Sequence, residues 1–112
     1  MIILKIFRPD EWQAFEAAGE TLGAPIDLLD GYIHFSTPEQ AAETAAKHFH
    51  GAGDLVLAAV DADRLGETLK WEVSRGDALF PHLYRALELS DVIWTRSMPM
   101  NADGGHDLPS LE

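Results

Sequence analysis

The sequence predicts a small α+β domain, and three observations support this fold class. The chain has 112 residues, 46% of them hydrophobic, which is enough to bury one core. Two segments have helical periodicity and begin at proline-containing start signals, which predicts two main helices. Short apolar or alternating runs surround them, and these predict about six strands, with most strand pairing late in the chain.

Strands and helices alternate in the first half of the chain. Residues 2–7 form an apolar strand that only Lys5 interrupts, and a helix begins at Pro9 with acids in its first turn. The apolar residues of this helix recur every three or four positions: Trp12, Phe15, Ala18 and Leu22. Residues 24–31 are predicted to be a loop that an Asp-Gly turn closes.

The second helix follows a short strand at residues 32–35. Ser36, Thr37, Pro38 and Glu39 have the capping-box pattern S-x-x-E with proline inside, which predicts a helix start directly behind that strand. Alanines share one face of this helix, so it can lie close against a sheet.

Further strands are predicted at residues 55–60, 68–73, 82–84 and 92–95. The first is an unbroken apolar run, as expected for a central strand covered on both faces. In the second, Trp71 alternates with charged residues, which places it in a buried row. From residue 97 the chain is polar and glycine-rich, so we expect one domain at residues 1–96 and a flexible tail at 97–112.

The charge balance excludes one class of partner. The chain has 8 lysines and arginines against 19 acids, a net charge of −11, so we expect no binding to long nucleic acid. Lys5 and Arg8 lie close together near the start, and other bases come late, so the fold could still form one positive cleft for a nucleotide. Without cysteines, a bilayer-spanning run or a secretory leader pattern, the expected location is the cytoplasm, with no membrane partner. The sequence leaves the oligomeric state open.

No standard catalytic or phosphate-binding motif is present, and we expect no metal site. His48 and His50 are two positions apart at the end of a helix and therefore diverge around it. His106 lies in the expected tail, exposed to solvent.

The short strand at residues 32–35 carries the first candidate site. Tyr32, His34 and Ser36 alternate onto one face, beside a helix N-terminus whose N–H groups favour anions. This pattern fits a binding site. It also fits a simpler interpretation, in which Ser36 or Thr37 caps the helix and His34 is a hydrogen-bonded residue on a half-buried strand.

The segment KWEVSRGDALFPHLYR carries the second candidate site. Glu72, Arg75, His82 and Tyr84 combine both signs of charge with a titratable imidazole, as in small-molecule pockets. In the alternative interpretation the aromatic residues, Trp71 among them, are core and Arg75 pairs with a surface acid. His82 follows Pro81 in an expected loop, where functional residues are common.

Two motifs identify the chain as a member of a known family. D-G-Y-I-H-F-S and F-P-H-L-Y occur in the order typical of the small bacterial family called domain of unknown function 952, and the resemblance runs over residues 3–94. More distantly, YIHFSTPEQAAETAAKHF followed by DLVLAAVDADRL is similar to the second half of the RNA 2′-phosphotransferases. These enzymes belong to the ADP-ribosyltransferase superfamily, so this resemblance implies a small split antiparallel or mixed sheet that binds NAD around the nicotinamide.

The distant resemblance also implies roles for individual residues. Residues 32–36 would line a nicotinamide-ribose cleft, with Lys5 on the first strand opposite. His34 and Ser36 or Thr37 would contact the ribose, Tyr32 or Tyr84 would stack on the ring, and Arg75 with Lys5 or Arg8 would hold phosphate. His82 is the candidate acid or base, and Glu72 the candidate carboxylate for an oxocarbenium ion.

The chain departs from the phosphotransferases in three respects. It has no G-H-S segment with the associated arginines, Lys5 stands where many superfamily members have histidine, and no glutamate matches the late-strand position. NAD as a substrate, without a metal, is therefore expected more than transfer of an RNA phosphate. Three hypotheses remain: an NAD-dependent transferase, a non-catalytic nucleotide- or metabolite-binding module, and a protein-interaction domain with an unused cleft.

Overall fold

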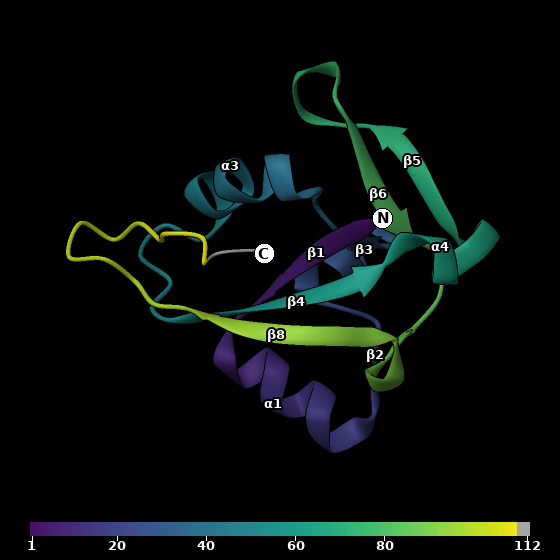
Figure 1. Ribbon diagram of the computed structural model, residues 1–112, viewed down its shortest axis with the longest axis horizontal. Helices are drawn as coiled ribbons and strands as arrows, with labels where there is room; N and C mark the ends of the chain where they lie inside the picture. Colours follow the sequence, from purple (N-terminus) through teal and green to yellow (C-terminus); the bar gives the residue numbers. More distant parts are fainter. Residues whose placement is uncertain (110–112) are drawn as a thin grey trace.

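The computed structural model describes residues 1–109, apart from the side chain of Arg75. The chain forms eight described strands and four α-helices, with short 3-10 turns between some of them (Figure 1). The strands are β1 (Ile2–Phe7), β2 (Glu20–Thr21), β3 (Ile33–His34), β4 (Leu55–Asp61), β5 (Leu69–Val73), β6 (Leu79–Leu83), β7 (Leu87–Glu88) and β8 (Val92–Met98). The helices are α1 (Pro9–Ala18), α2 (Pro25–Asp30), α3 (Pro38–His48) and α4 (Ala62–Leu65). None of these helices is long and apolar enough to cross a membrane.

The described strands form three small antiparallel sheets, where the distant resemblance implies one small split sheet. Two have three strands, in the orders β1-β4-β8 and β3-β6-β5, and the third pairs β2 with β7. An isolated bridge between Leu4 and Ser36 joins the edge of β1 to the residues that follow β3. The α+β class is confirmed, and β4 is the central strand that its apolar run predicts.

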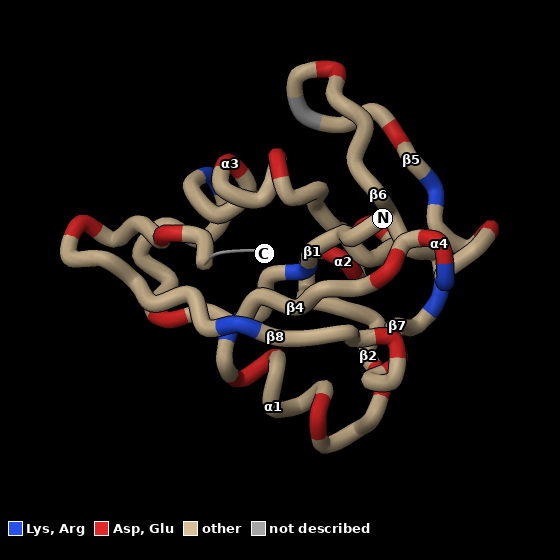
Figure 2. Tube along the Cα trace, in the orientation of Figure 1, with Lys and Arg blue, Asp and Glu red and all other residues tan. Residues whose placement is uncertain are grey.

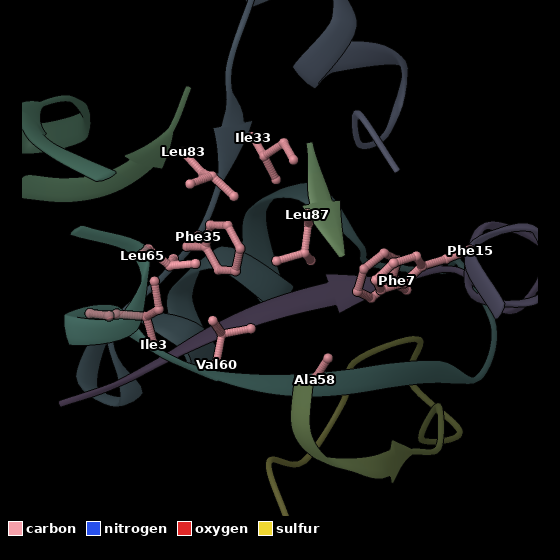
Figure 3. Packing of buried hydrophobic residues seen from close by; sticks show 11 residues of the cluster. Ile3, Phe7, Phe15, Ile33, Phe35, Ala58, Val60, Leu65, Leu83 and Leu87 are labelled. Carbon is pink, nitrogen blue, oxygen red and sulfur yellow. The ribbon is translucent and has the colours of Figure 1, made fainter. Parts of the chain in front are cut away.

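The β1-β4-β8 sheet is covered on both faces. On one face, Ile3, Phe7 and Val60 pack with Phe15 of α1 and with residues of β3 and β6, among them Ile33 (Figure 3). On the other face, Leu4, Ile6 and Leu57 of the sheet belong to a second cluster. This cluster includes two small residues of α3, Ala41 and Ala45. The two main helices therefore lie on opposite faces of this sheet.

The helices differ from prediction in two respects: α1 ends earlier, and the structure contains an additional short helix, α2. Helix α1 ends at Ala18 because Gly19 adopts φ +80° and its N–H donates to the carbonyl of Phe15, 2.8 Å away. Leu22 therefore lies beyond the helix and is 60% exposed. The predicted loop at residues 24–31 contains α2, which has proline at its first position and Gly31 in the left-handed conformation at its end.

The β5–β6 hairpin also corrects two expectations. The connection between the strands expected at residues 68–73 and 82–84 is shorter than predicted, because β6 begins at Leu79 and includes Pro81 and His82. Trp71 alternates as predicted, but its row faces outward near the tip, and its side chain is exposed instead of lying in the core.

The domain boundary expected at residues 96 and 97 falls inside β8. Met98 is fully buried, and the described residues after it fold back on the domain. Nε2 of His106, which the sequence places in solvent, lies 2.6 Å from the carbonyl oxygen of Gly53. Residues 97–109 are thus packed against the domain; residues 110–112 lie outside the described part.

Candidate functional site

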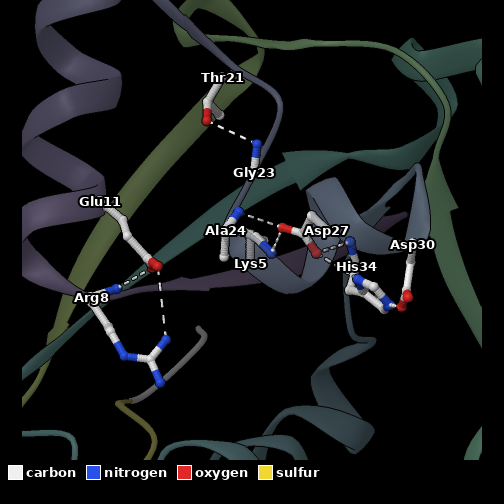
Figure 4. Close-up of polar contacts among 9 residues, drawn as sticks. All are labelled: Lys5, Arg8, Glu11, Thr21, Gly23, Ala24, Asp27, Asp30 and His34. Atoms are coloured by element: carbon white, nitrogen blue, oxygen red, sulfur yellow. Dashed lines mark hydrogen bonds and ion pairs between the residues drawn. The ribbon is translucent and has the colours of Figure 1, made fainter.

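A buried ion pair forms the base of the site. Lys5 lies on the same face of β1 as Ile3 and Phe7, and it is 7% exposed. A charge in that environment needs a partner, because its desolvation is costly. Asp27 of α2 supplies it: its Oδ2 lies 2.7 Å from Nζ of Lys5, and its side chain is fully buried (Figure 4).

Asp27 also holds the strand that carries His34. Its Oδ1 accepts from the backbone N–H of His34 at 3.1 Å and lies 2.5 Å from Nδ1 of the imidazole. Its Oδ2 accepts a further bond, from the backbone N–H of Ala24 at 2.8 Å. The neighbouring Gly23 has φ +101°, and a Cβ there would collide with the carboxylate of Asp27. One carboxylate therefore ties together β1, α2 and β3.

These contacts keep Asp27 ionised. Burial by itself would raise the pKa of Asp27, but the hydrogen bond from His34 and the charge of Lys5 outweigh burial and lower the pKa from 3.8 to about 2. An ionised carboxylate only accepts hydrogen bonds, so Nδ1 of His34 must carry a proton and donate it to Asp27. The other ring nitrogen of His34, Nε2, lies 3.0 Å from Oδ2 of Asp30, a partly exposed carboxylate.

A second histidine stands beside the first. His34 and His82 are direct partners in the β3–β6 ladder, and their ring centroids are 5.3 Å apart. The N–H of His34 points away from β6 toward Asp27, so the two histidines form a non-hydrogen-bonded pair, in which side chains lie close. Strand pairing thus brings together the two candidate segments of the sequence.

His82 has its own carboxylate partner. The His82 side chain is 3% exposed, and its Nδ1 lies 2.9 Å from Oε1 of Glu72 on β5. The hydroxyl of Tyr84 donates to the same oxygen at 2.7 Å. The hydrogen bonds from Tyr84 and His82 lower the pKa of Glu72, and the bond to Glu72 raises the pKa of Tyr84 to about 12. Glu72 is therefore ionised and Tyr84 protonated at neutral pH.

Tyr32 completes the aromatic group. Its ring stacks on His82 at a centroid distance of 4.2 Å and lies 5.3 Å from the ring of Tyr84. Burial, together with the nearby charge of Asp30, raises the pKa of this phenol.

A cavity of about 770 Å³ opens beside the two histidines. Its lining includes six of the polar and charged residues described in this subsection or predicted from the sequence: Lys5, Asp27, Asp30, His34, Ser36 and His82. Arg8, Asp10 and Glu11 line it where α1 begins. This volume lies in the range of small-molecule sites in proteins, about 300–1,000 Å³.

The structure brings some of the predicted site residues together and separates others. Lys5, His34, Ser36 and His82 line the cavity of about 770 Å³. Tyr32 and Tyr84 line a separate, smaller hollow of about 230 Å³, which shares only Asp27 with the large one. Glu72 is absent from both linings and reaches the cavity only through His82.

Two further predicted residues need separate mention. The hydroxyl of Thr37 accepts from the N–H of Gln40 at 3.2 Å, so Thr37 caps α3 and is not a cavity-lining residue. Ser36 remains in the lining, where its Oγ lies 2.9 Å from Oγ1 of Thr44. The side chain of Arg75 lies outside the described part of the structure, so its predicted role stays a prediction.

The sequence patterns do not identify Asp27, the carboxylate that holds both Lys5 and His34. One signal pointed to such a residue: a lysine inside an apolar strand needs a buried acid. The sequence did not show which of its 19 acids this was, because Asp27 is 22 positions from Lys5 in a segment that resembles a loop. Within the described residues, no group of three or more His, Cys, Asp or Glu side chains is placed to hold a metal ion.

Comparisons with known proteins show what this chain is similar to. The family model described as "Protein of unknown function (DUF952)" matches residues 6–95. The X-ray crystal structure of protein CC0527 from Caulobacter crescentus is 51% identical, with a TM-score of 0.92 over 96% of this chain and 94% of that one. The solution NMR structure of the same protein is 53% identical, with a TM-score of 0.83 over 93% and 90% of the two chains. No curated protein matches.

Proposed function

The chain belongs to the family of proteins of unknown function DUF952, and we propose that it binds NAD or a related nucleotide in the large cavity, as an enzyme of the ADP-ribosyltransferase type. One observation carries this proposal. Lys5, His34, Ser36 and His82 come from separate segments of the chain, yet they line one cavity of about 770 Å³. Convergent polar groups in a large cavity are typical of a ligand site.

The charges around the cavity support a particular orientation of the ligand. Lys5 is neutralised by Asp27, so Lys5 positions that carboxylate and is not free for a phosphate. Asp30, which lies beside Nε2 of His34, then makes this region acidic, which favours the positive ring of an oxidised nicotinamide. The diphosphate would lie toward Arg8, whose side chain is 41% exposed and forms only a long ion pair with Glu11, at 3.8 Å.

In this arrangement His34 and Ser36 contact the ribose. Asp27 holds Nδ1 of His34, and Nε2 lies 3.0 Å from Oδ2 of Asp30, so a ribose hydroxyl would share Nε2 with that carboxylate or replace it there. His82 is the acid or base, because Glu72 fixes its Nδ1 and leaves Nε2 for a substrate. The stacking role expected of Tyr32 and Tyr84 has less support, because both rings belong to the smaller hollow.

One observation favours the second candidate, a nucleotide-binding module without turnover. Glu72, the carboxylate expected to stabilise an oxocarbenium ion, has its Oε1 engaged by both His82 and Tyr84 and does not line the cavity. A site of this kind retains binding groups and lacks the expected electrostatic partner for the transition state.

The acidic surface is consistent with a small ligand. Figure 2 shows acids along most of the chain, with fewer lysines and arginines between them. A surface with a net charge of −11 repels the phosphates of a long nucleic acid but leaves a single nucleotide able to enter a cavity.

A ligand-observed NMR titration with NAD, ADP-ribose and nicotinamide tests the proposal. The wild type is expected to bind NAD, and His34→Ala to weaken binding at least about tenfold, the usual effect of losing a hydrogen bond to a charged or polar ligand. His50→Ala is the matched control, because His50 does not line the cavity. Amide spectra establish that each variant is folded.

The outcomes separate the two candidates. Release of nicotinamide during long incubation supports the transferase, and binding without any product supports the binding module. Failure of the folded wild type to bind any of the three compounds would overturn both.

A further inference from the structure

The β5 strand forms a free edge of the molecule. In the sheet order β3-β6-β5 it pairs on one side only, and Figure 1 shows no strand beyond it. Edge strands with unpaired backbone groups are templates for pairing with another chain. The backbone groups and the sequence of β5 favour a second copy of the same strand as the partner.

The hydrogen-bond pattern of the hairpin shows which groups face outward. Thr68 accepts from the N–H of Tyr84, and Ser74 donates to Ala78, so the even-numbered residues of β5 bond to β6. Trp71 pairs with Pro81, which has no N–H to donate, in agreement with this alternation. The N–H and C=O groups of the odd-numbered residues, Leu69, Trp71 and Val73, therefore point to the free edge.

The sequence of the strand, LKWEV, is complementary to itself when reversed about Trp71. If two copies pair antiparallel through a two-fold axis at Trp71, Leu69 of one lies opposite Val73 of the other. Lys70 then lies opposite Glu72, twice in each dimer. Cross-strand pairs of opposite charge and of apolar side chains both stabilise a sheet.

The side chains at this edge are also exposed apolar groups. Trp71 is 39% exposed, and Val73 and its cross-strand partner Leu79 are 64% and 52% exposed. Burial of these exposed apolar side chains by a second copy would favour association.

We propose that β5 is the interface of a symmetric homodimer, in which the β5 strands of two copies pair antiparallel about Trp71 and join their two sheets into one. The outward backbone groups of Leu69, Trp71 and Val73 then bond to those of the second copy. The alternating charges favour this register over its neighbours. A shift of two residues would set Lys70 opposite Lys70 or Glu72 opposite Glu72, and like charges would repel. The interface shares Glu72 with the candidate site, because Oε1 of Glu72 also bonds to His82 and Tyr84. Its test measures association and not ligand binding, so either proposal can fail without the other.

The dimer is expected to be weak and to depend on salt. An edge contact between short strands buries less than the about 1,600 Å² of a standard interface, so we expect dissociation in the micromolar to millimolar range. Each copy carries a net charge of −11, so the copies repel at a distance, and salt screens this repulsion. Self-association of the full chain should therefore strengthen as NaCl rises from low to moderate concentration.

Sedimentation velocity over a concentration series tests the interface with a charge exchange. Lys70→Glu sets carboxylates opposite each other and should weaken the dimer about tenfold. Lys47→Glu makes the same change of charge on α3, where Lys47 pairs with Glu43, and should leave the dimer nearly unchanged. Glu72→Lys alone should also weaken the dimer.

Mixing gives the decisive measurement. An equimolar mixture of the Lys70→Glu and Glu72→Lys chains restores both charge pairs in a heterodimer, so it should associate more tightly than either variant alone. A wild type that remains monomeric at millimolar concentration and moderate salt overturns the proposal. Dimers that respond equally to Lys70→Glu and Lys47→Glu also overturn it, because they must use another face.

Discussion

At the scale of single residues, the site is organised around Asp27. This carboxylate is buried, accepts from the backbones of Ala24 and His34, and pairs with both Lys5 and the His34 ring. The alternation of Tyr32 to Ser36 predicts that His34 faces away from the core, and the burial of Ile33 and Phe35 agrees with this prediction. Sequence patterns show the direction of a side chain on a strand, but the distant acid that meets it depends on tertiary packing.

Replacing Asp27 should destabilise the protein in a pH-dependent way. Because its folded pKa is lowered from 3.8 to about 2, the carboxylate contributes stability above the unfolded pKa and loses it as the pH falls through the folded value. Asp27→Asn should therefore lower the free energy of unfolding by about 2 kcal/mol at pH 7, and the difference from the wild type should shrink between about pH 4 and pH 2. Urea unfolding at several pH values measures this.

The control for Asp27→Asn is Asp107→Asn, which changes the same charge at an exposed position. It should leave stability nearly unchanged at every pH. A loss in Asp27→Asn that stays constant down to pH 2 would contradict the assignment of an ionised, ion-paired carboxylate.

At the scale of elements, the start of α3 shows how a nearly correct prediction fails. Two capping patterns occur there, offset by one position: Ser36 with Glu39, and Thr37 with Gln40. The structure uses the second, because Pro38 takes the first helical position and the cap must precede it. This leaves Ser36 free to form the bridge with Leu4 and to line the cavity.

Thr37→Ala should therefore reduce stability without affecting the site. Loss of the cap is expected to lower the free energy of unfolding by about 1 kcal/mol. NAD binding, measured by the same NMR titration, should be unchanged, whereas Ser36→Ala should weaken it. Weaker binding in Thr37→Ala would instead mean that Thr37 contacts the ligand, as the resemblance implies.

The β5 strand illustrates a different limit of sequence patterns. The alternation in LKWEV correctly predicts a strand, and the pairing of β5 with β6 brings Glu72 to His82. Periodicity does not show whether the apolar row meets a core or solvent, because this depends on what the rest of the chain places over the hairpin.

At the scale of the whole molecule, the α+β class and the central position of β4 follow from composition and pattern. The way in which the strands are grouped into sheets and the sheets are joined does not, because it depends on pairing between residues far apart in the chain, such as the bridge between Leu4 and Ser36. The C-terminal end of the domain also depends on tertiary packing. A polar, glycine-rich composition suggested a tail, but β8 is held by its pairing with β4, which extends to Met98.

Met98 offers a test of this boundary. Its side chain is fully buried against the second core cluster, so Met98→Ala should lower the free energy of unfolding by about 2–5 kcal/mol. Met100, two positions later, is 40% exposed, and Met100→Ala should cost much less. Chemical denaturation of both variants measures the difference, and equal effects would mean that the domain does end before residue 97.

The buried pair of Lys5 and Asp27 also constrains how this sequence can change during evolution. A substitution of either residue alone leaves a charge without its partner in the core, at a cost of about 2–5 kcal/mol, a large part of the stability of a typical domain. A side chain at Gly23 would displace the same carboxylate. These three positions are thus expected to covary: related chains should keep all of them, or replace both members of the pair with apolar residues. Because a single replacement is costly, such a change requires that other substitutions stabilise the protein first.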